Sequence, residues 1–251
     1  MIQKLTQRLP GADIGRWLAP LGQAMVLALG TFSIESVSNF SWGEYRKACR
    51  WMGPGSFHLV ALAAVFVASS LVIQLVVELK KYHAQDVIGA VISLGLLRGI
   101  GPLTVGLALC ARIAAYIAKE AKPYKANDLR REFSKKFVLP RLLAALTVAL
   151  PLAAYGLLIG FITSALVSVV IGGGSTNYFF QSARQAVHDK DIAAYFIKLA
   201  FAFPIIAVFA GCVSGLGQTD KGFSAAANAV TATFICGFFA NLVITIALFL
   251  I

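Results

Sequence analysis

Long apolar runs separated by short polar segments dominate the chain. Five runs reach or exceed the roughly 20 residues that a helix needs to cross the hydrocarbon layer of a bilayer, and they lie at about 56–78, 87–118, 142–171, 196–216 and 223–251. Residues 13–34 are less apolar, are interrupted by Pro20 and carry Arg16 beside Trp17. That mixture favours a helix lying at the membrane interface over a sixth crossing.

The pattern therefore predicts an all-α polytopic membrane protein, with an N-terminal interfacial helix and five transmembrane helices. We expect a single membrane domain over 1–251, in which a cytoplasmic or interfacial region (1–55) precedes a five-span core (56–251). Composition agrees, because 59% of the 251 residues are hydrophobic, only 13% are charged and the mean hydropathy is +0.79. A soluble domain of this size needs a far more polar surface.

The net charge of +11 does not indicate a nucleic-acid partner, because the basic residues lie in short segments that flank the apolar runs. Fifteen of the 22 Lys and Arg residues fall in the N-terminal region, in 119–141 and in the turn at 217–222. We assign these segments to the cytoplasm, and Lys80, Lys81, Arg184, Lys190 and Lys198 to the exterior. The positive-inside rule then predicts a cytoplasmic N-terminus and an exterior C-terminus in the cell's inner (plasma) membrane.

The second run contains the unusual sequence LLRGIGPL at 96–103. Pro102 removes the helical hydrogen bond to the carbonyl of Arg98 and is expected to kink the helix, while Gly99 and Gly101 allow another backbone to approach closely. Arg98 and Arg112 are about four helical turns apart and fall on a similar face. Each arginine can face a substrate route or be purely structural, by snorkelling or by pairing with carbonyls freed by Pro102.

Few other residues suggest chemistry. Gln74 and Asn241 interrupt apolar runs and could bond across helix interfaces, and the three histidines and four cysteines are too scattered for a metal site. Since no nucleophile–base set or phosphate loop is visible, we expect no enzymatic activity and no cofactor or metal on this chain.

The basic segment 119–141 contains a candidate docking helix. Asn127 or Asp128 could cap a helix that carries Leu129, Phe133 and Phe137 on one stripe. Such a stripe could dock into a groove of another protein or lie on anionic lipid headgroups, and the sequence leaves both open.

The spacing of several residues resembles the MlaE/YrbE permeases, the membrane subunits of Mce-type lipid ABC transporters. The chain has LRGIGP, CAR and AKEA where the family has approximately L-R-E-L-G-P, A-G-R and A-E-x-G, and its C-terminal stretch from about 178 is similar as well. It departs from the family at Gly99, where the family has a glutamate, at Ala111, and at Asn241, which matches an acidic position. The segment after Glu120 is also shorter.

The resemblance implies a permease dimer of two copies or paralogues, a cytoplasmic ATPase dimer that binds ATP and Mg, and an exterior Mce-domain partner that exchanges phospholipid. It places Gln74, Arg98, Gly99, Gly101, Pro102, Arg112 and Asn241 on the lipid path. It places Glu120, Asp128, Leu129, Arg130, Phe133 and Phe137 at the ATPase coupling surface. Gly99 in place of a carboxylate would leave Arg98 freer to meet a phosphate.

Two other functions stay open at this point. A non-transporting scaffold or assembly subunit fits the altered cytoplasmic segment, although the retained Arg-Gly-Pro sequence argues against it. A proton-coupled secondary transporter is disfavoured because no carboxylate lies in the middle of a predicted span.

Overall fold

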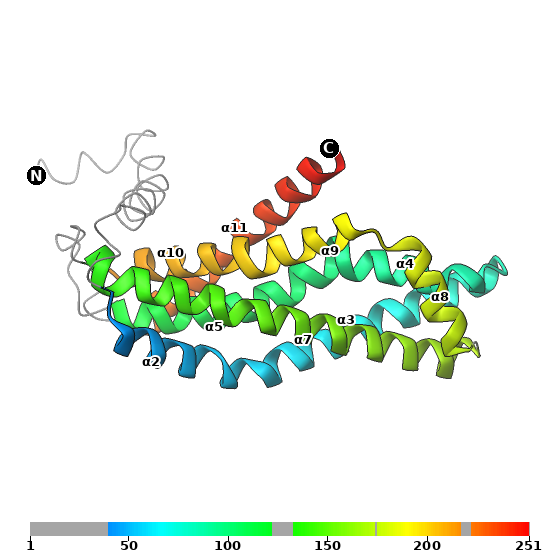
Figure 1. Ribbon diagram of the computed structural model, residues 1–251, viewed down its shortest axis with the longest axis horizontal. Helices are drawn as coiled ribbons and strands as arrows, with labels where there is room; N and C mark the ends of the chain where they lie inside the picture. The colour runs from blue at the N-terminus through cyan, green and yellow to red at the C-terminus, as the bar shows by residue number, and fades with distance from the viewer. Residues whose placement is uncertain (1–39, 122–132, 174, 217–221, 251) are drawn as a thin grey trace, which may run out of the picture.

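The chain is a bundle of long helices (Figure 1). The computed structural model describes residues 40–121, 133–173, 175–216 and 222–250, and none of these residues forms a strand. In chain order the α-helices are α2 (Trp42–Met52), α3 (Pro54–Lys81), α4 (Ile88–Leu94), α5 (Ile100–Ala121), α7 (Leu139–Gly172), α8 (Thr176–Ala186), α9 (Asp189–Phe196), α10 (Phe203–Gly215) and α11 (Gly222–Leu250). Shorter segments are the 3₁₀ turn η4 (Gln85–Val87) and the π-helical turns η5 (Gly95–Gly99), η7 (Ser134–Val138) and η8 (Ile197–Ala202).

Five helical stretches are long and apolar enough to cross a membrane, which confirms the predicted fold class. They are Trp42–Lys81, Ile88–Ala121, Lys136–Gly172, Asp189–Gly215 and Ser224–Leu248. Each contains one of the five runs recognised in the sequence or nearly all of it. The predicted interfacial helix at 13–34 lies outside the described residues. Helix α2 ends just before Gly53, and α3 begins just after it.

The second and fourth spans depart from the expected pattern. Around the expected interruption at Pro102, a π-helical turn, η5, precedes the proline, and α5 begins at Ile100 and continues through Pro102. Before the fourth apolar run the chain forms two helices, α8 and α9, because the backbone is extended at Val187 and His188 between them. The second of these helices, α9, runs through η8 into α10 to form the fourth span.

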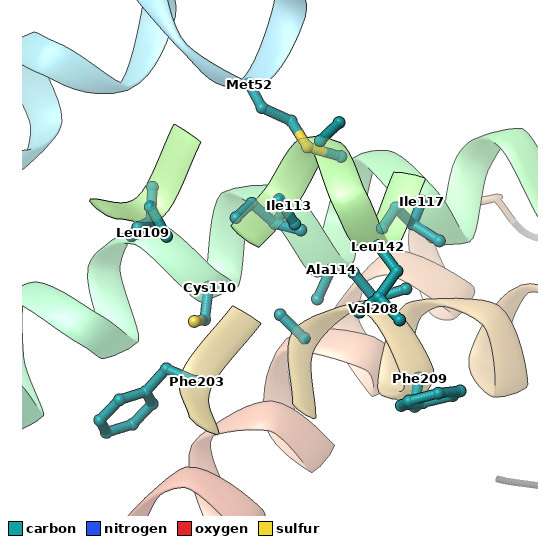
Figure 2. Close-up of a cluster of buried hydrophobic side chains, with 14 of the residues drawn as sticks. Met52, Leu109, Cys110, Ile113, Ala114, Ile117, Leu142, Phe203, Val208 and Phe209 are labelled. Carbon is teal, nitrogen blue, oxygen red and sulfur yellow. The ribbon is translucent and has the colours of Figure 1, made fainter. Parts of the chain in front are cut away.

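Helix α5 lies at the centre of the bundle, where it packs against α10, α11 and α3, while α7 packs against α3 and α2. Figure 2 shows part of the buried core, in which side chains from α2, α5, α7 and α10 meet, among them Met52, Ile113, Leu142 and Val208. Many large apolar side chains point outward from α3, α7 and α11. A helix that is hydrophobic on all sides suits a lipid environment.

The close contact between α5 and α10 requires two glycines. A Cβ added to Gly211 would lie 2.8 Å from the carbonyl oxygen of Ala114, and one added to Gly215 would lie 2.6 Å from that of Ala118. Small residues let helix backbones approach in this way, and in lipid this packing replaces much of the hydrophobic driving force.

We therefore predict that Gly215→Ala lowers thermal stability although alanine is the better helix former by about 0.5–1 kcal/mol. The new methyl group would push α10 away from α5, against backbone that cannot move aside cheaply. Thermal unfolding of the detergent-purified protein measures the effect. Gly43→Ala is the matched control because no atom lies within 4 Å of an added Cβ at that position; equal melting temperatures for the two variants would contradict the prediction.

Candidate functional site

A cavity of about 570 Å³ lies where the second, fourth and fifth spans separate. Its walls come from η5, from α9 and η8, and from the C-terminal half of α11, which diverges from the bundle in Figure 1. The lining residues are Arg98, His188, Asp189, Lys190, Asp191, Ala194, Lys198, Thr245 and Leu248. The cavity thus combines a charged wall with the apolar end of a membrane helix.

Arg98 forms the main ion pair of this cavity. Its Nε donates to Asp191 Oδ1 at 2.6 Å and its Nη2 donates to Oδ2 at 3.2 Å, so both carboxylate oxygens are engaged. Asp191 Oδ2 also accepts a hydrogen bond from the backbone N–H of His188 as part of a capping box at the start of α9. Such two-point pairing fixes the orientation of both side chains.

This pair corrects one expectation from the sequence. Position 99 is a glycine where the MlaE/YrbE permeases have a glutamate. Arg98 nevertheless has a carboxylate partner, because Asp191 supplies one from another helix. The reason lies in the tertiary structure, because the first turn of α9 lies beside η5 and brings Asp191 to Arg98 although the two residues are 93 positions apart in the chain.

Lys198 is buried on the inner wall, with 1% of its surface exposed. Its Nζ donates to the carbonyl oxygen of Arg98 at 2.6 Å and to Thr245 Oγ1 at 2.7 Å. Pro102 has no N–H with which to satisfy that carbonyl, which lies four residues earlier. Lys198 therefore bonds the backbone group that the proline leaves open, and its assignment to the exterior side stays a prediction.

The two glycines of LRGIGP have different surroundings. A Cβ on Gly101 would clash with the carbonyl of Leu96 in the preceding turn, so this glycine permits the tight backbone at η5. Around Gly99 no atom lies within 4 Å of an added Cβ, so the close approach of another helix that we expected at this position does not occur within the described chain.

The remaining lipid-path candidates lie apart from one another. Gln74 is exposed on α3 and does not line the cavity. Asn241 lies one turn before Thr245 on α11, and its backbone oxygen accepts the Thr245 hydroxyl at 2.6 Å. Arg112 is part of a different cluster, because its Nη1 donates to the Gly55 carbonyl at 2.6 Å and its guanidinium lies 4.8 Å from the Trp51 ring centroid. Arg98 and Arg112 therefore do not form one site.

A second charged cluster, here called the clamp, joins α2, α5 and α7 at the other end of the second span. Arg141, whose side chain is 6% exposed, bonds Glu120 Oε2 from Nε at 2.7 Å and Glu44 Oε2 from Nη2 at 3.0 Å. Glu120 also accepts the Tyr116 hydroxyl at 2.5 Å and lies 3.6 Å from Lys47 Nζ. The clamp thus ties three helices together through charge-assisted hydrogen bonds.

The predicted docking stripe is partly wrong. Phe133 and Phe137 are 4% and 3% exposed, and they stack on each other at 4.8 Å within the chain's own core. Neither ring can therefore fill a groove on another protein in this conformation. Asp128, Leu129 and Arg130 lie outside the described residues, so their coupling role stays a prediction, as does that of Glu120.

Comparison with known proteins identifies the class. The sequence model of the family described as Permease MlaE matches residues 45–121 and 131–251. The chain belongs to the MlaE permease family. It is thus a multi-pass permease subunit of the ABC transporter class, which is a transport component.

Its relatives are similar over most of their length. A "Probable ABC transporter permease protein" of Rickettsia bellii is 26% identical over 93% of this chain and 95% of its own. Another of the same description from Synechocystis is 26% identical over 75% of this chain and 76% of its own. "Protein TRIGALACTOSYLDIACYLGLYCEROL 1, chloroplastic" of Arabidopsis thaliana is 27% identical over 79% of this chain and 59% of its own.

Sequence reasoning missed Asp191 and Lys198 as cavity residues of this MlaE permease. Both lie close to the start of the fourth apolar run, where charges are ordinarily exposed at the membrane surface. Their spacing of seven residues, two helical turns, was the available signal that both face the same neighbour. Among the described residues, no group of three His, Cys, Asp or Glu side chains could hold a metal ion.

We predict measurable coupling between Arg98 and Asp191. In a double-mutant cycle of Arg98→Gln and Asp191→Asn, the free energies of unfolding should couple by about 1–3 kcal/mol, because the pair is bidentate and Asp191 is mostly buried. The matched control is the exposed pair of Lys81 and Glu78, at 2.8 Å with both side chains about 60% exposed, for which about 0.2–0.5 kcal/mol is expected. Similar coupling in both cycles would show that the cavity pair is no stronger than a surface pair.

We also predict that Arg141→Gln destabilises the protein by about 3–5 kcal/mol, because it leaves two carboxylates in the clamp without their guanidinium. Unfolding in mixed micelles measures the effect. Arg184→Gln, at an exposed position of α8, is the charge-matched control and should change stability by less than about 0.5 kcal/mol. A melting temperature of the Arg141 variant equal to that of the control would rule the clamp out as a stabilising element.

Proposed function

We propose that this chain is the lipid-translocating permease subunit of an ABC transporter, moving phospholipid or a related lipid between the inner membrane and an exterior Mce-domain protein. A separate cytoplasmic ATPase dimer, binding ATP and Mg, would supply the energy, and a second permease copy or paralogue would complete the path. The N-terminus would be cytoplasmic and the C-terminus exterior.

The observation that carries this proposal is the cavity at Arg98. Its charged wall holds Arg98, Asp191 and Lys198, and Leu248 of the diverging helix α11 is part of the opposite, apolar side. A phospholipid needs this combination, a polar site for the phosphate and an apolar surface for the chains. Because the cavity lies among membrane-spanning helices, lipid could enter it without passing through water.

The name of the Arabidopsis relative supports a lipid substrate, since trigalactosyldiacylglycerol is a glycolipid. In the present chain an anionic phosphate is favoured because Arg98, Lys190 and Lys198 outnumber the two carboxylates of the lining, Asp189 and Asp191, and leave it with a net positive charge.

The clamp supports coupling to an ATPase. Glu120 ends the second span and Phe133, Phe137 and Arg141 begin the third, so the clamp brackets the segment that the sequence assigns to ATPase contact. Arg98 and Glu120 belong to one helical stretch, Ile88–Ala121. Movement at the clamp would therefore be carried along this stretch to the cavity, about 33 Å away at 1.5 Å per residue.

We predict that Arg98→Ala lowers lipid occupancy of the purified complex about ten-fold or more, because it removes a charge-assisted hydrogen bond to the phosphate. Mass spectrometry of the co-purified lipid measures occupancy, and lipid-stimulated ATP hydrolysis measures coupling. Arg184→Ala controls for the loss of one positive charge at an exposed position.

The same measurements separate transport from a scaffold role. A transport subunit gives ATP hydrolysis that rises with added phospholipid and falls in the Arg98 variant. A stable complex whose rate of ATP hydrolysis does not change when phospholipid is added, and whose Arg98 variant contains as much lipid as the wild type, would instead identify a scaffold or assembly subunit.

A further inference from the structure

A basic pocket separate from the cavity lies on the outer face of α2. It has a volume of about 500 Å³ and is lined by Gly43, Arg46, Lys47, Arg50, Trp51 and Tyr116. Three of these six residues are cationic and two are aromatic, and no carboxylate lines the pocket. The pocket shares Lys47 and Tyr116 with the clamp, because both contact Glu120, but Arg46, Arg50 and Trp51 belong to neither the cavity nor the clamp.

The pocket floor is held rigidly. Trp51 stacks on Tyr116 of α5 with ring centroids 3.8 Å apart, and the Arg112 guanidinium lies 4.8 Å from the Trp51 ring centroid. Arg112 is in turn bonded to the Gly55 carbonyl at the start of α3. These contacts join three helices and hold the indole ring in place.

The inner face of α2 is anchored to α7, which fixes the outer face toward the surroundings. Ala48 and Met52 are buried, the Tyr45 hydroxyl donates to Thr147 Oγ1 at 3.2 Å, and Glu44 is held by Arg141. The opposite face therefore presents the basic side chains outward, and Figure 1 shows α2 leading into α3 at the edge of the bundle.

The charges of the pocket are poorly neutralised by the chain itself. Arg46 and Arg50 are exposed, and no described carboxylate forms an ion pair with either. They stand four residues apart on one helix face, where like charges repel. Lys47 has a partner in Glu120, at 3.6 Å, but that carboxylate is shared with Arg141. An external anion at this face would relieve the repulsion.

The depth of the pocket indicates where that anion comes from. The apolar run of the first span begins near residue 56, so at 1.5 Å per helical residue Arg50 and Arg46 lie at most about 9 and 15 Å beyond its end. Headgroups begin where the hydrocarbon ends, and long basic side chains beside tryptophan are typical of this layer. Trp42 and Trp51 are 64% and 38% exposed on the same helix.

We propose that this pocket binds the phosphate of an anionic phospholipid from the surrounding leaflet, with Arg46 and Arg50 as its cationic ligands and Trp51 as its aromatic floor. The bound lipid would be a fixed neighbour of α2, not the transported one. The proposal does not depend on the transport function, because it concerns a different surface.

The test is native mass spectrometry of the purified full-length protein with dioleoyl phosphatidylglycerol or dioleoyl phosphatidylcholine. The wild-type protein should bind phosphatidylglycerol in preference to phosphatidylcholine. In the double variant Arg46→Gln/Arg50→Gln, the ratio of the two bound lipids should fall about five-fold for each arginine removed. Since both side chains are exposed and neither forms an ion pair with a described carboxylate, the variant should retain its fold. The control Lys81→Gln/Arg184→Gln removes two exposed charges elsewhere and should leave the preference unchanged.

Four results would overturn the proposal. An equal loss of lipid preference in the control would show that only net charge matters. Loss of the preference in the single variant Arg98→Gln, with the Arg46/Arg50 variant unchanged, would place the bound lipid in the cavity. Displacement of phosphatidylglycerol by millimolar inorganic phosphate would identify a free-phosphate site. Unchanged lipid preference in the Arg46/Arg50 variant, with loss of a co-purifying protein, would identify an acidic protein surface as the partner.

Discussion

The hydrogen bond from Lys198 to the carbonyl of Arg98 is the contact on which the cavity depends. In a membrane a backbone carbonyl without a partner costs several kcal/mol, and Pro102 creates such a carbonyl in the second span. By satisfying it, Lys198 ties the fourth span to the second. The same contact brings Asp191 to the Arg98 side chain and, through Thr245, fixes the distance to α11. The unsatisfied carbonyl that Pro102 leaves in the second span thereby sets the arrangement of the second, fourth and fifth spans.

The two charged clusters lie on the same continuous helix but serve different neighbours. At one end Arg98 meets α9, and toward the other end Glu120 meets Arg141 of α7. Charges at such positions are stable only when paired and hydrogen-bonded, since burial penalises each ion alone. Pairing therefore explains how a chain that is 59% hydrophobic retains charged side chains inside its helix bundle.

Helix α2 shows how one short amphipathic element can have two tasks. Its inner face completes the clamp through Glu44, and its outer face forms the basic pocket around Trp51. The residues of these faces alternate with the helical period, so neither task limits the other. The break at Gly53 allows α2 to end and the first apolar span to begin within two residues.

The sequence by itself determined the number of spans, because the length and composition of an apolar run decide whether it can cross a bilayer. It also drew attention to Arg98 and Pro102, since such residues are costly in a membrane helix. Only the tertiary structure decided the partners. Asp191 and Lys198 lie ninety or more residues from Arg98, and Phe133 and Phe137 are buried by helices that their own periodicity cannot identify. Periodicity reports which face of a helix is apolar, whereas partners depend on which helices the folded chain places side by side.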